Sequence, residues 1–129
     1  MTQHVPNKVQ LHKKSKRLEV QYGEESFLLE AEYLRVCSPS AEVKGHGPGQ
    51  EVLQVGKQDV GITHLEANGN YAVRIIFDDG HDSGIFTWNY LYDLGKNHQQ
   101  HWNAYLEKLN KAGKGRDSNV SVVKFIDPS

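Results

Sequence analysis

The fold of this chain is decided by residues 60–87, VGITHLEANGNYAVRIIFDDGHDSGIFT. Two runs within this stretch, 60–65 and 71–77, are rich in β-branched and aromatic residues, which is typical of strands. Asn68-Gly69-Asn70 stands between them, and an Asn-Gly pair supplies the positive φ angles that a tight hairpin requires. The sequence therefore predicts an antiparallel hairpin here.

A second turn follows directly, at Asp79-Gly80, before a third β-rich run. If these two residues form a two-residue turn, Asp78 pairs with His81 and Val73 faces Phe86. The face that carries Val73 and Phe86 is apolar enough to pack against the core. The stretch as a whole predicts a three-stranded antiparallel meander.

The flanking segments predict a second hairpin and two C-terminal helices. Apolar and polar residues alternate over 17–22 and the pattern resumes at 27–29, which is typical of a hairpin with one buried face. Residues 88–94 suit a short helix, and a longer helix follows from Asn97, as its N-cap, to Gly113. The longer helix has one apolar stripe at helical spacing: Trp102, Tyr105, Leu106, Leu109 and Ala112. The predicted fold class is α+β, a single domain in which an antiparallel meander or sheet packs with two C-terminal helices.

Length and charge limit the functions that this chain can have. Its 129 residues correspond to one domain, and 15 basic against 16 acidic residues leave a net charge of −1. A near-neutral chain lacks the basic face expected of an obligate nucleic-acid binder, and no apolar run approaches the roughly 20 residues of a membrane helix. A single cysteine excludes an internal disulfide framework and fits a reducing compartment. We therefore expect a cytoplasmic protein that binds neither nucleic acid nor membranes.

The two ends of the chain are expected to lie outside the folded domain. Residues 1–16 form a flexible basic arm without a single acidic residue, and such a segment buries too little apolar surface to fold. The domain itself spans 17–113. Residues 114–129 form a linker followed by 120–126 (VSVVKFI), which is either a strand or an interaction tail.

A long loop and a histidine-bearing turn are the chemical candidates. Residues 37–50, CSPSAEVKGHGPGQ, are rich in Ser, Pro and Gly, and long loops are often functional. His81 lies between Asp78-Asp79 and Asp82, so one of these acids could orient its ring. Cys37 opens the loop and could be a nucleophile only if the fold brings a base such as His81 within reach.

Three segments taken together resemble a known family. They are 33–43 (YLRVCSPSAEV) with the GHGPGQ of 45–50, then 69–73 (GNYAV), then 77–88 (FDDGHDSGIFTW). In this order they resemble the small bacterial proteins of the domain-of-unknown-function 971 family, which is similar to the N-terminal domain of gamma-butyrobetaine hydroxylase. The likeness covers roughly residues 14–112, and the Asp-Gly-His-x-Ser segment is its most specific part.

This resemblance implies a structural zinc site that the sequence does not retain. In the hydroxylase domain the metal is held by a Cys-x-Cys-x-x-Cys loop and one histidine. The histidine falls on His81, whereas the three cysteines fall on Ser38, Ser40 and Val43. Serine is a poor zinc ligand beside a thiolate, valine is no ligand, and a closed zinc site needs four ligands. We therefore predict that zinc is absent or weakly bound.

The resemblance also bears on activity. The oxygenase centre of the hydroxylase lies in a separate, larger domain for which 129 residues leave no room, so hydroxylation is not expected. Related domains are fused to P-loop carriers of iron–sulfur clusters. That association implies an accessory or docking role linked to cluster or metalloenzyme assembly.

Three hypotheses about function follow, and we favour the first because no catalytic constellation is visible. The chain is a non-catalytic module that contacts a protein partner, of unspecified identity, through the loop and the turn: Ser38, Ser40, Gly45, His46, Gly47, Asp79 and Asp82. Alternatively, it binds zinc or iron through His81 with Cys37 or His46. A third hypothesis is a small enzyme that depends on Cys37. The oligomeric state does not follow from the sequence.

Overall fold

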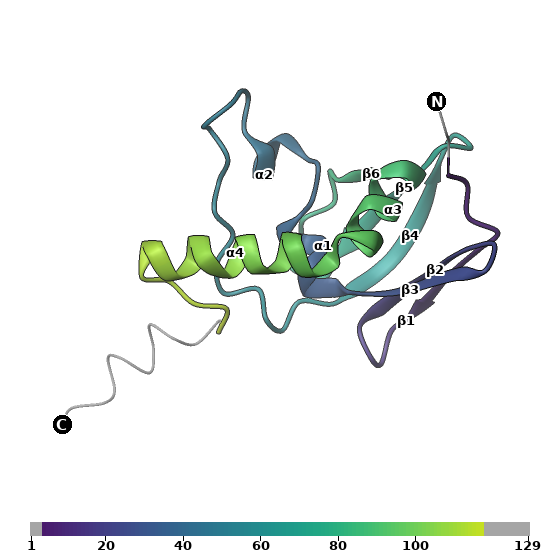
Figure 1. The fold of residues 1–129 in the computed structure, drawn as a ribbon, viewed down its shortest axis with the longest axis horizontal. Coiled ribbons are helices and arrows are strands. Elements are labelled where there is room, and N and C mark those ends of the chain that lie inside the picture. Colours follow the sequence, from purple (N-terminus) through teal and green to yellow (C-terminus); the bar gives the residue numbers. More distant parts are fainter. Residues whose placement is uncertain (1–3, 118–129) are drawn as a thin grey trace.

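The computed structural model describes residues 4–117, which form two three-stranded antiparallel sheets and four helices (Figure 1). Helix α3 contacts strands of both sheets. The predicted α+β class is confirmed. The first sheet has the order β1-β2-β3, with β1 at Lys8–His12, β2 at Arg17–Tyr22 and β3 at Glu25–Glu30; the second has the order β4-β5-β6, with β4 at Ile62–Asn68, β5 at Ala72–Phe77 and β6 at Ile85–Thr87. The helices are α1 at Ala31–Val36, α2 at Ala41–Lys44, α3 at Trp88–Lys96 and α4 at His98–Ala112.

The second sheet is the predicted meander, and Val73 faces Phe86 as expected. The predicted length of its second turn is wrong by one residue, however. The Phe77 amide donates to the His81 carbonyl at 3.0 Å, so three residues form the turn and Asp78 does not pair with His81. Gly80 takes the left-handed conformation, with φ of 93°, as the last residue of a three-residue hairpin loop usually does.

The first hairpin of the meander also differs in detail. Asn68 pairs with Ala72, which leaves three residues in the loop, and of these Gly69 alone has a positive φ angle, 61°. One left-handed residue is therefore enough to reverse the chain here.

The prediction of a flexible basic arm at 1–16 is wrong, because Lys8–His12 forms strand β1. Within β1, Val9 and Leu11 alternate with polar residues and pair with Val20 and Leu18 of β2. The two side chains pack against the core, which offsets the entropy of ordering the strand. The folded domain therefore begins before the predicted boundary at residue 17.

Helix α1 lies at the centre of the fold, and all six of its residues are buried. The Tyr33 hydroxyl donates to the backbone oxygen of Leu94 at 2.7 Å, and Leu34 is fully enclosed in the core. Glu32 accepts two hydrogen bonds of 2.7 Å from the guanidinium of Arg116. Six residues are too few for a stable isolated helix, so these tertiary contacts hold α1 in shape.

The two C-terminal helices are confirmed, but the details of α4 differ from the prediction. Asn97 makes no side-chain capping bond and instead donates to Asp93 at 2.7 Å. Gly113 ends the helix in the left-handed conformation as predicted. Of the predicted stripe, Tyr105 and Leu109 are buried and Trp102 is half-buried, whereas Leu106 and Ala112 are exposed.

The segment after α4 folds back onto the domain instead of forming a free linker. Its carbonyls at Gly115 and Arg116 each accept a 3.0 Å hydrogen bond, from the amides of Gly56 and Gln58. The proposed strand or tail at 120–126 lies outside the described residues. Within 4–117, no helix has the length and apolar character needed to cross a bilayer.

Candidate functional site

The predicted loop at 37–50 contains one short helix and is closed by backbone hydrogen bonds. Ser40 caps α2, because its hydroxyl accepts from the Glu42 amide at 3.2 Å. The Val52 amide donates to the Val43 carbonyl at 2.8 Å and brings the two arms of the loop together. Gly45 has a φ of 77°, and a side chain there would collide with the carbonyl of Gln50. The loop is therefore a defined lobe that stands over α4 (Figure 1).

His81 is the centre of a polar cluster between this loop and the β5–β6 turn. Its Nε2 lies 2.9 Å from the hydroxyl of Ser38, and both residues are buried. The hydroxyls of Ser40 and Ser83 are 2.6 Å apart, and Ser83 donates to Glu42 at 2.6 Å. We call these five residues the polar cluster.

The electrostatics of the polar cluster favour a neutral imidazole. Burial lowers the pKa of His81, and the nearby Arg35 guanidinium lowers it further, against the opposing pull of Glu42 and Asp79. Nδ1 of His81 lies 3.5 Å from Glu42 Oε1 and has no hydrogen-bond partner within residues 4–117. The acid beside the ring is thus Glu42 from the loop, and not one of the adjacent aspartates.

The Ser38 hydroxyl, the His81 imidazole and the Glu42 carboxylate follow one another in space as in a hydrolytic triad, but Ser38 is enclosed. Ser38 has no exposed surface, and Gly84 packs so closely that a Cβ there would collide with the Ser38 hydroxyl. A nucleophilic serine needs room for a substrate carbonyl at its oxygen. The hydroxyl of Ser38 therefore has no room for a substrate carbonyl in this structure.

Asp79 fastens the turn to α1 and to the following loop. Its Oδ2 accepts from Arg35 Nε and from Lys57 Nζ, each at 2.9 Å, and its Oδ1 accepts from the His81 amide at 3.1 Å. Burial alone would raise the pKa of Asp79, but these hydrogen bonds and the Arg35 charge lower it to about 2. Arg35 also donates to Gln54 at 2.9 Å, so one buried guanidinium joins three segments.

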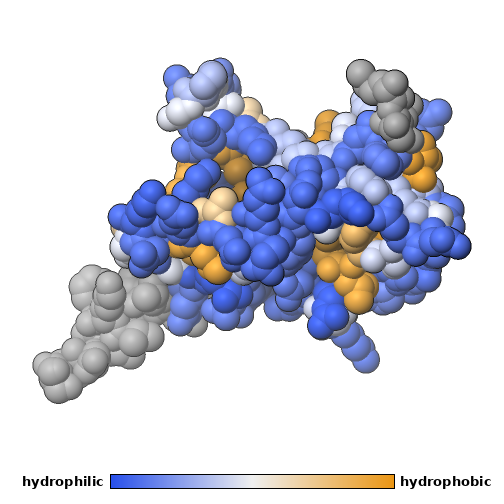
Figure 2. Space-filling view, in the orientation of Figure 1, coloured by the Kyte–Doolittle hydropathy of each residue, from blue (hydrophilic) through white to orange (hydrophobic). Residues whose placement is uncertain are grey.

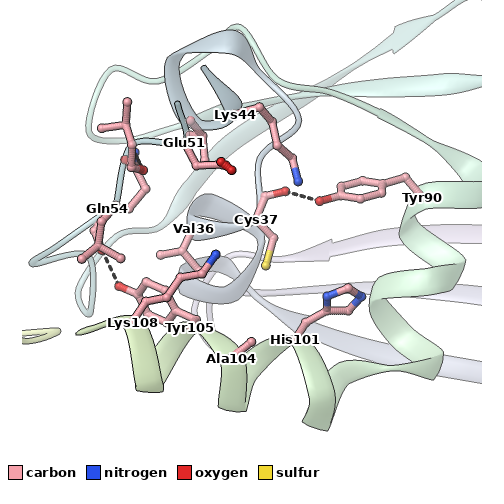
Figure 3. A pocket seen from close by; sticks show the side chains of 13 residues that line it. Val36, Cys37, Lys44, Glu51, Gln54, Tyr90, His101, Ala104, Tyr105 and Lys108 are labelled. Carbon is pink, nitrogen blue, oxygen red and sulfur yellow. Dashed lines mark hydrogen bonds between the residues drawn. The ribbon is translucent and has the colours of Figure 1, made fainter. Parts of the chain in front are cut away.

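A groove of about 450 Å³ lies between the loop lobe and α4 (Figure 3). Figure 2 shows hydrophobic surface in the hollow at this place. Ligand sites typically have volumes of roughly 300–1,000 Å³ and mostly apolar walls. The apolar part of its lining is Val36, Val43, Val52, Leu53, Ala104 and Tyr105.

Most polar groups of the groove already have partners. The Tyr90 hydroxyl donates to the Cys37 carbonyl at 2.6 Å, and the Tyr105 hydroxyl donates to the Gln54 carbonyl at 2.7 Å. Burial raises the pKa of the Cys37 thiol to about 11, even though two lysines nearby oppose the shift. The thiol is therefore protonated at neutral pH and is no activated nucleophile.

Comparison with known proteins identifies the family of this chain. The sequence profile of gamma-butyrobetaine hydroxylase-like N-terminal domains matches residues 9–92. The chain belongs to this family. One solved structure, a solution NMR structure, is 54% identical, has a TM-score of 0.80, and aligns over 91% of this chain and 93% of its own. A second NMR structure is 42% identical, has a TM-score of 0.76, and aligns over 91% of each chain.

A third solved structure carries the name of the family predicted from the sequence. It is the crystal structure of a protein of unknown function in the DUF971 family from Acidithiobacillus ferrooxidans. It is 32% identical, with a TM-score of 0.54, over 70% of this chain and 91% of its own. No curated protein matches the chain. The comparisons thus establish the family and leave the function of this gamma-butyrobetaine hydroxylase-like domain open.

The residues of this family member do not fit the zinc site that the resemblance implies. The Ser38 hydroxyl is bonded to the imidazole of His81, and the Val43 side chain lines the groove instead. Cys37 also lines the groove, and His46 is exposed on the loop. Within residues 4–117, no three His, Cys, Asp or Glu side chains are grouped to hold a metal ion. The structure therefore does not bring His81, Cys37 and His46 together.

The predicted interaction residues divide into two groups. Ser38 and Ser40 are buried and Asp79 is tied to Arg35, so these three hold the loop and the turn in place. Gly45 and Gly47 are half-buried, and His46 and Asp82 are exposed. The groove walls were not predicted, because they come from five segments that carry no common motif.

Proposed function

We propose that this domain is a non-catalytic docking module that binds an apolar segment of a partner protein in the groove between the loop lobe and α4. The apolar walls of the groove carry this proposal. Val52, on one wall, leaves 52% of its surface exposed, which gives a partner side chain direct access to the hollow.

Two observations support a role without chemistry. The groove contains one thiol, that of Cys37, and its raised pKa keeps it protonated. The hydroxyls of Tyr90 and Tyr105, which also line the groove, are bonded to backbone carbonyls. The Ser38 hydroxyl of the polar cluster is enclosed. A rigid wall is useful for docking, because little side-chain entropy is lost when a partner binds.

The size of the groove limits the extent of the contact. A hollow of about 450 Å³ has room for a few partner side chains, fewer than the roughly 20–30 residues that each partner contributes to a standard protein interface. We expect a transient complex with a dissociation constant on the order of micromolar. Assembly factors for iron–sulfur clusters or metalloenzymes are the first partners to test, because related domains are fused to cluster carriers.

Selection of peptides tests the proposal. A phage-displayed library of random 12-residue peptides is selected on the full chain, and the enriched peptides are synthesised and titrated by fluorescence anisotropy. Val52→Asp places a charge on the apolar wall and should weaken binding by at least tenfold. Leu28→Asp is the matched control, because Leu28 is also 52% exposed but lies on β3 outside the groove.

Two results would contradict the docking function. One is a selection that enriches no peptide above background. The other is a set of peptides whose affinity is the same for the wild type, Val52→Asp and Leu28→Asp. Equal unfolding midpoints for the three proteins ensure that the comparison reports binding and not folding.

A further inference from the structure

We infer that the groove selects an apolar segment that carries an acidic side chain, whose carboxylate sits between Lys44 and Lys108. This inference rests on the proposed docking function and adds the chemistry of the occupant. It comes from the charges in the groove and not from its apolar walls.

The two lysines approach the hollow from opposite walls. Lys44 ends helix α2 on the loop lobe, and Lys108 lies on α4. Both side chains line the groove, and Figure 3 shows both ammonium groups directed toward the space around Cys37. The charges of both lysines oppose the rise of the Cys37 pKa. A ligand atom near Cys37 is therefore within reach of two cations.

Neither lysine forms an ion pair with an acidic side chain within residues 4–117. Lys44 lies 5.4 Å from the centre of the Tyr90 ring, a cation–π contact that brings no negative charge to the ammonium group. Lys57, Lys96 and Lys111, by contrast, each contact a carboxylate at about 3 Å. The groove thus contains ammonium groups that lack a counter-charge in this part of the chain.

The other charged groups near the groove do not cancel this excess. Glu51 is the one carboxylate in the described lining, and its Oε2 accepts from the Gly49 amide at 3.1 Å. His101 also lines the groove, and its Nε2 lies 2.9 Å from Asp93. Asp93 also acts on the Cys37 thiol, but it lies outside the lining and contacts His101, so the lining itself holds two lysines against one glutamate beside apolar walls. An Asp or Glu next to apolar residues complements both features.

The expected effect is moderate and depends on salt. A partly exposed ion pair contributes up to about fivefold in affinity, so two lysines acting on one carboxylate should contribute about tenfold together. The contribution should shrink as salt rises, because charges near the surface are screened over about 10 Å at 0.1 M.

The experiment uses the selected peptides, synthesised with amidated C-termini so that side chains supply the only carboxylates. Each acidic peptide is compared with its Asn or Gln counterpart on the wild type, on the double variant Lys44→Gln/Lys108→Gln and on the control Lys13→Gln/Lys14→Gln. The control removes the same charge from the β1–β2 turn, away from the groove. We expect the groove variant alone to lose about tenfold for the acidic peptides and little for the neutral ones.

The outcomes separate this inference from the docking function. If the selected peptides contain no excess of Asp or Glu, or bind the groove variant as tightly as the wild type, the acidic occupant is wrong. In that case a loss of binding by Val52→Asp still supports docking. If no peptide binds at all, the docking function itself fails.

Discussion

The polar cluster and the groove lie on two sides of the same loop and differ in one physical respect. In the polar cluster the hydroxyls of Ser38, Ser40 and Ser83 are bonded to His81, to Glu42 or to one another, and Ser38 is sealed. In the groove two ammonium groups and several apolar side chains face a hollow. The comparison shows that a concentration of reactive residue types does not by itself identify a site. Accessible groups with unused interactions are the better guide.

The largest expected effect concerns the reactivity of Cys37, where an open groove holds an inert thiol. Because its pKa is raised to about 11, the thiolate fraction at neutral pH is small. Alkylation by iodoacetamide at pH 7.5 should be on the order of 100-fold slower than for a free thiol with a pKa near 8.5. Intact-mass spectrometry measures the rate, and urea-unfolded protein is the control. A folded-state rate equal to the unfolded one would show that the groove does not raise the pKa of the thiol.

The next effect tests how tightly the polar cluster is closed. Gly84→Ala places a methyl group against the Ser38 hydroxyl and beside the Phe86 ring, so it should reduce the free energy of unfolding by about 2 kcal/mol. Gly47→Ala is the matched control, since a Cβ at Gly47 meets nothing within 4 Å. Urea titrations of both variants provide the comparison. Equal stabilities would mean that the polar cluster has spare volume and that Ser38 is less enclosed than described.

A smaller effect, which depends on pH, concerns the contacts of Asp79 beside the polar cluster. The folded-state pKa of Asp79, about 2, lies below that of the unfolded chain, so its contribution is present above about pH 4 and is lost as the pH falls toward 2. Asp79→Asn should therefore reduce the free energy of unfolding by about 1 kcal/mol at pH 7, after allowance for solvent screening, and by much less at pH 2.5. Urea unfolding at the two pH values measures this difference. A difference that does not change with pH would contradict the account of the turn.

The smallest expected effect is the response to metal removal. Because the place of the implied ligands is filled by bonded serines and by Val43, treatment with EDTA should not change the unfolding midpoint. Thermal unfolding followed by circular dichroism, before and after dialysis against EDTA, measures the shift. A fall of several degrees that added zinc reverses would show that the polar cluster holds a metal after all.

Much of the fold could be predicted because its pattern is local. The meander followed from strand runs separated by Gly-containing turns, and α4 followed from its apolar spacing and from Gly113. The turn at 78–80 was predicted with two residues instead of three, because its geometry depends on Asp79 accepting from the His81 amide. Strand β1 was missed because the lysines of the N-terminal segment obscured the alternation of Val9 and Leu11, and these two side chains find a packing partner only beside β2.

The candidate site was less predictable, since its contacts join distant parts of the chain. His81 was identified as special, yet the acid beside its ring is Glu42 and not a neighbouring aspartate. The groove was missed because its walls belong to α1, α2, the loop after α2, α3 and α4, and no single wall has a distinctive motif. Lys44 and Lys108 are ordinary surface residues until the fold places them on opposite walls.

By itself, the amino-acid sequence determined the α+β class, the central meander and the family, because these follow from periodicity, turn residues and short motifs within neighbouring segments. The tertiary structure decided which polar residues are sealed and which remain available. Burial and charge pairing are properties of side chains brought together from separate segments, so they cannot be read from any one of those segments. That is why the serines that stand in the positions of the metal ligands became a closed network, while two unremarkable lysines came to face a groove.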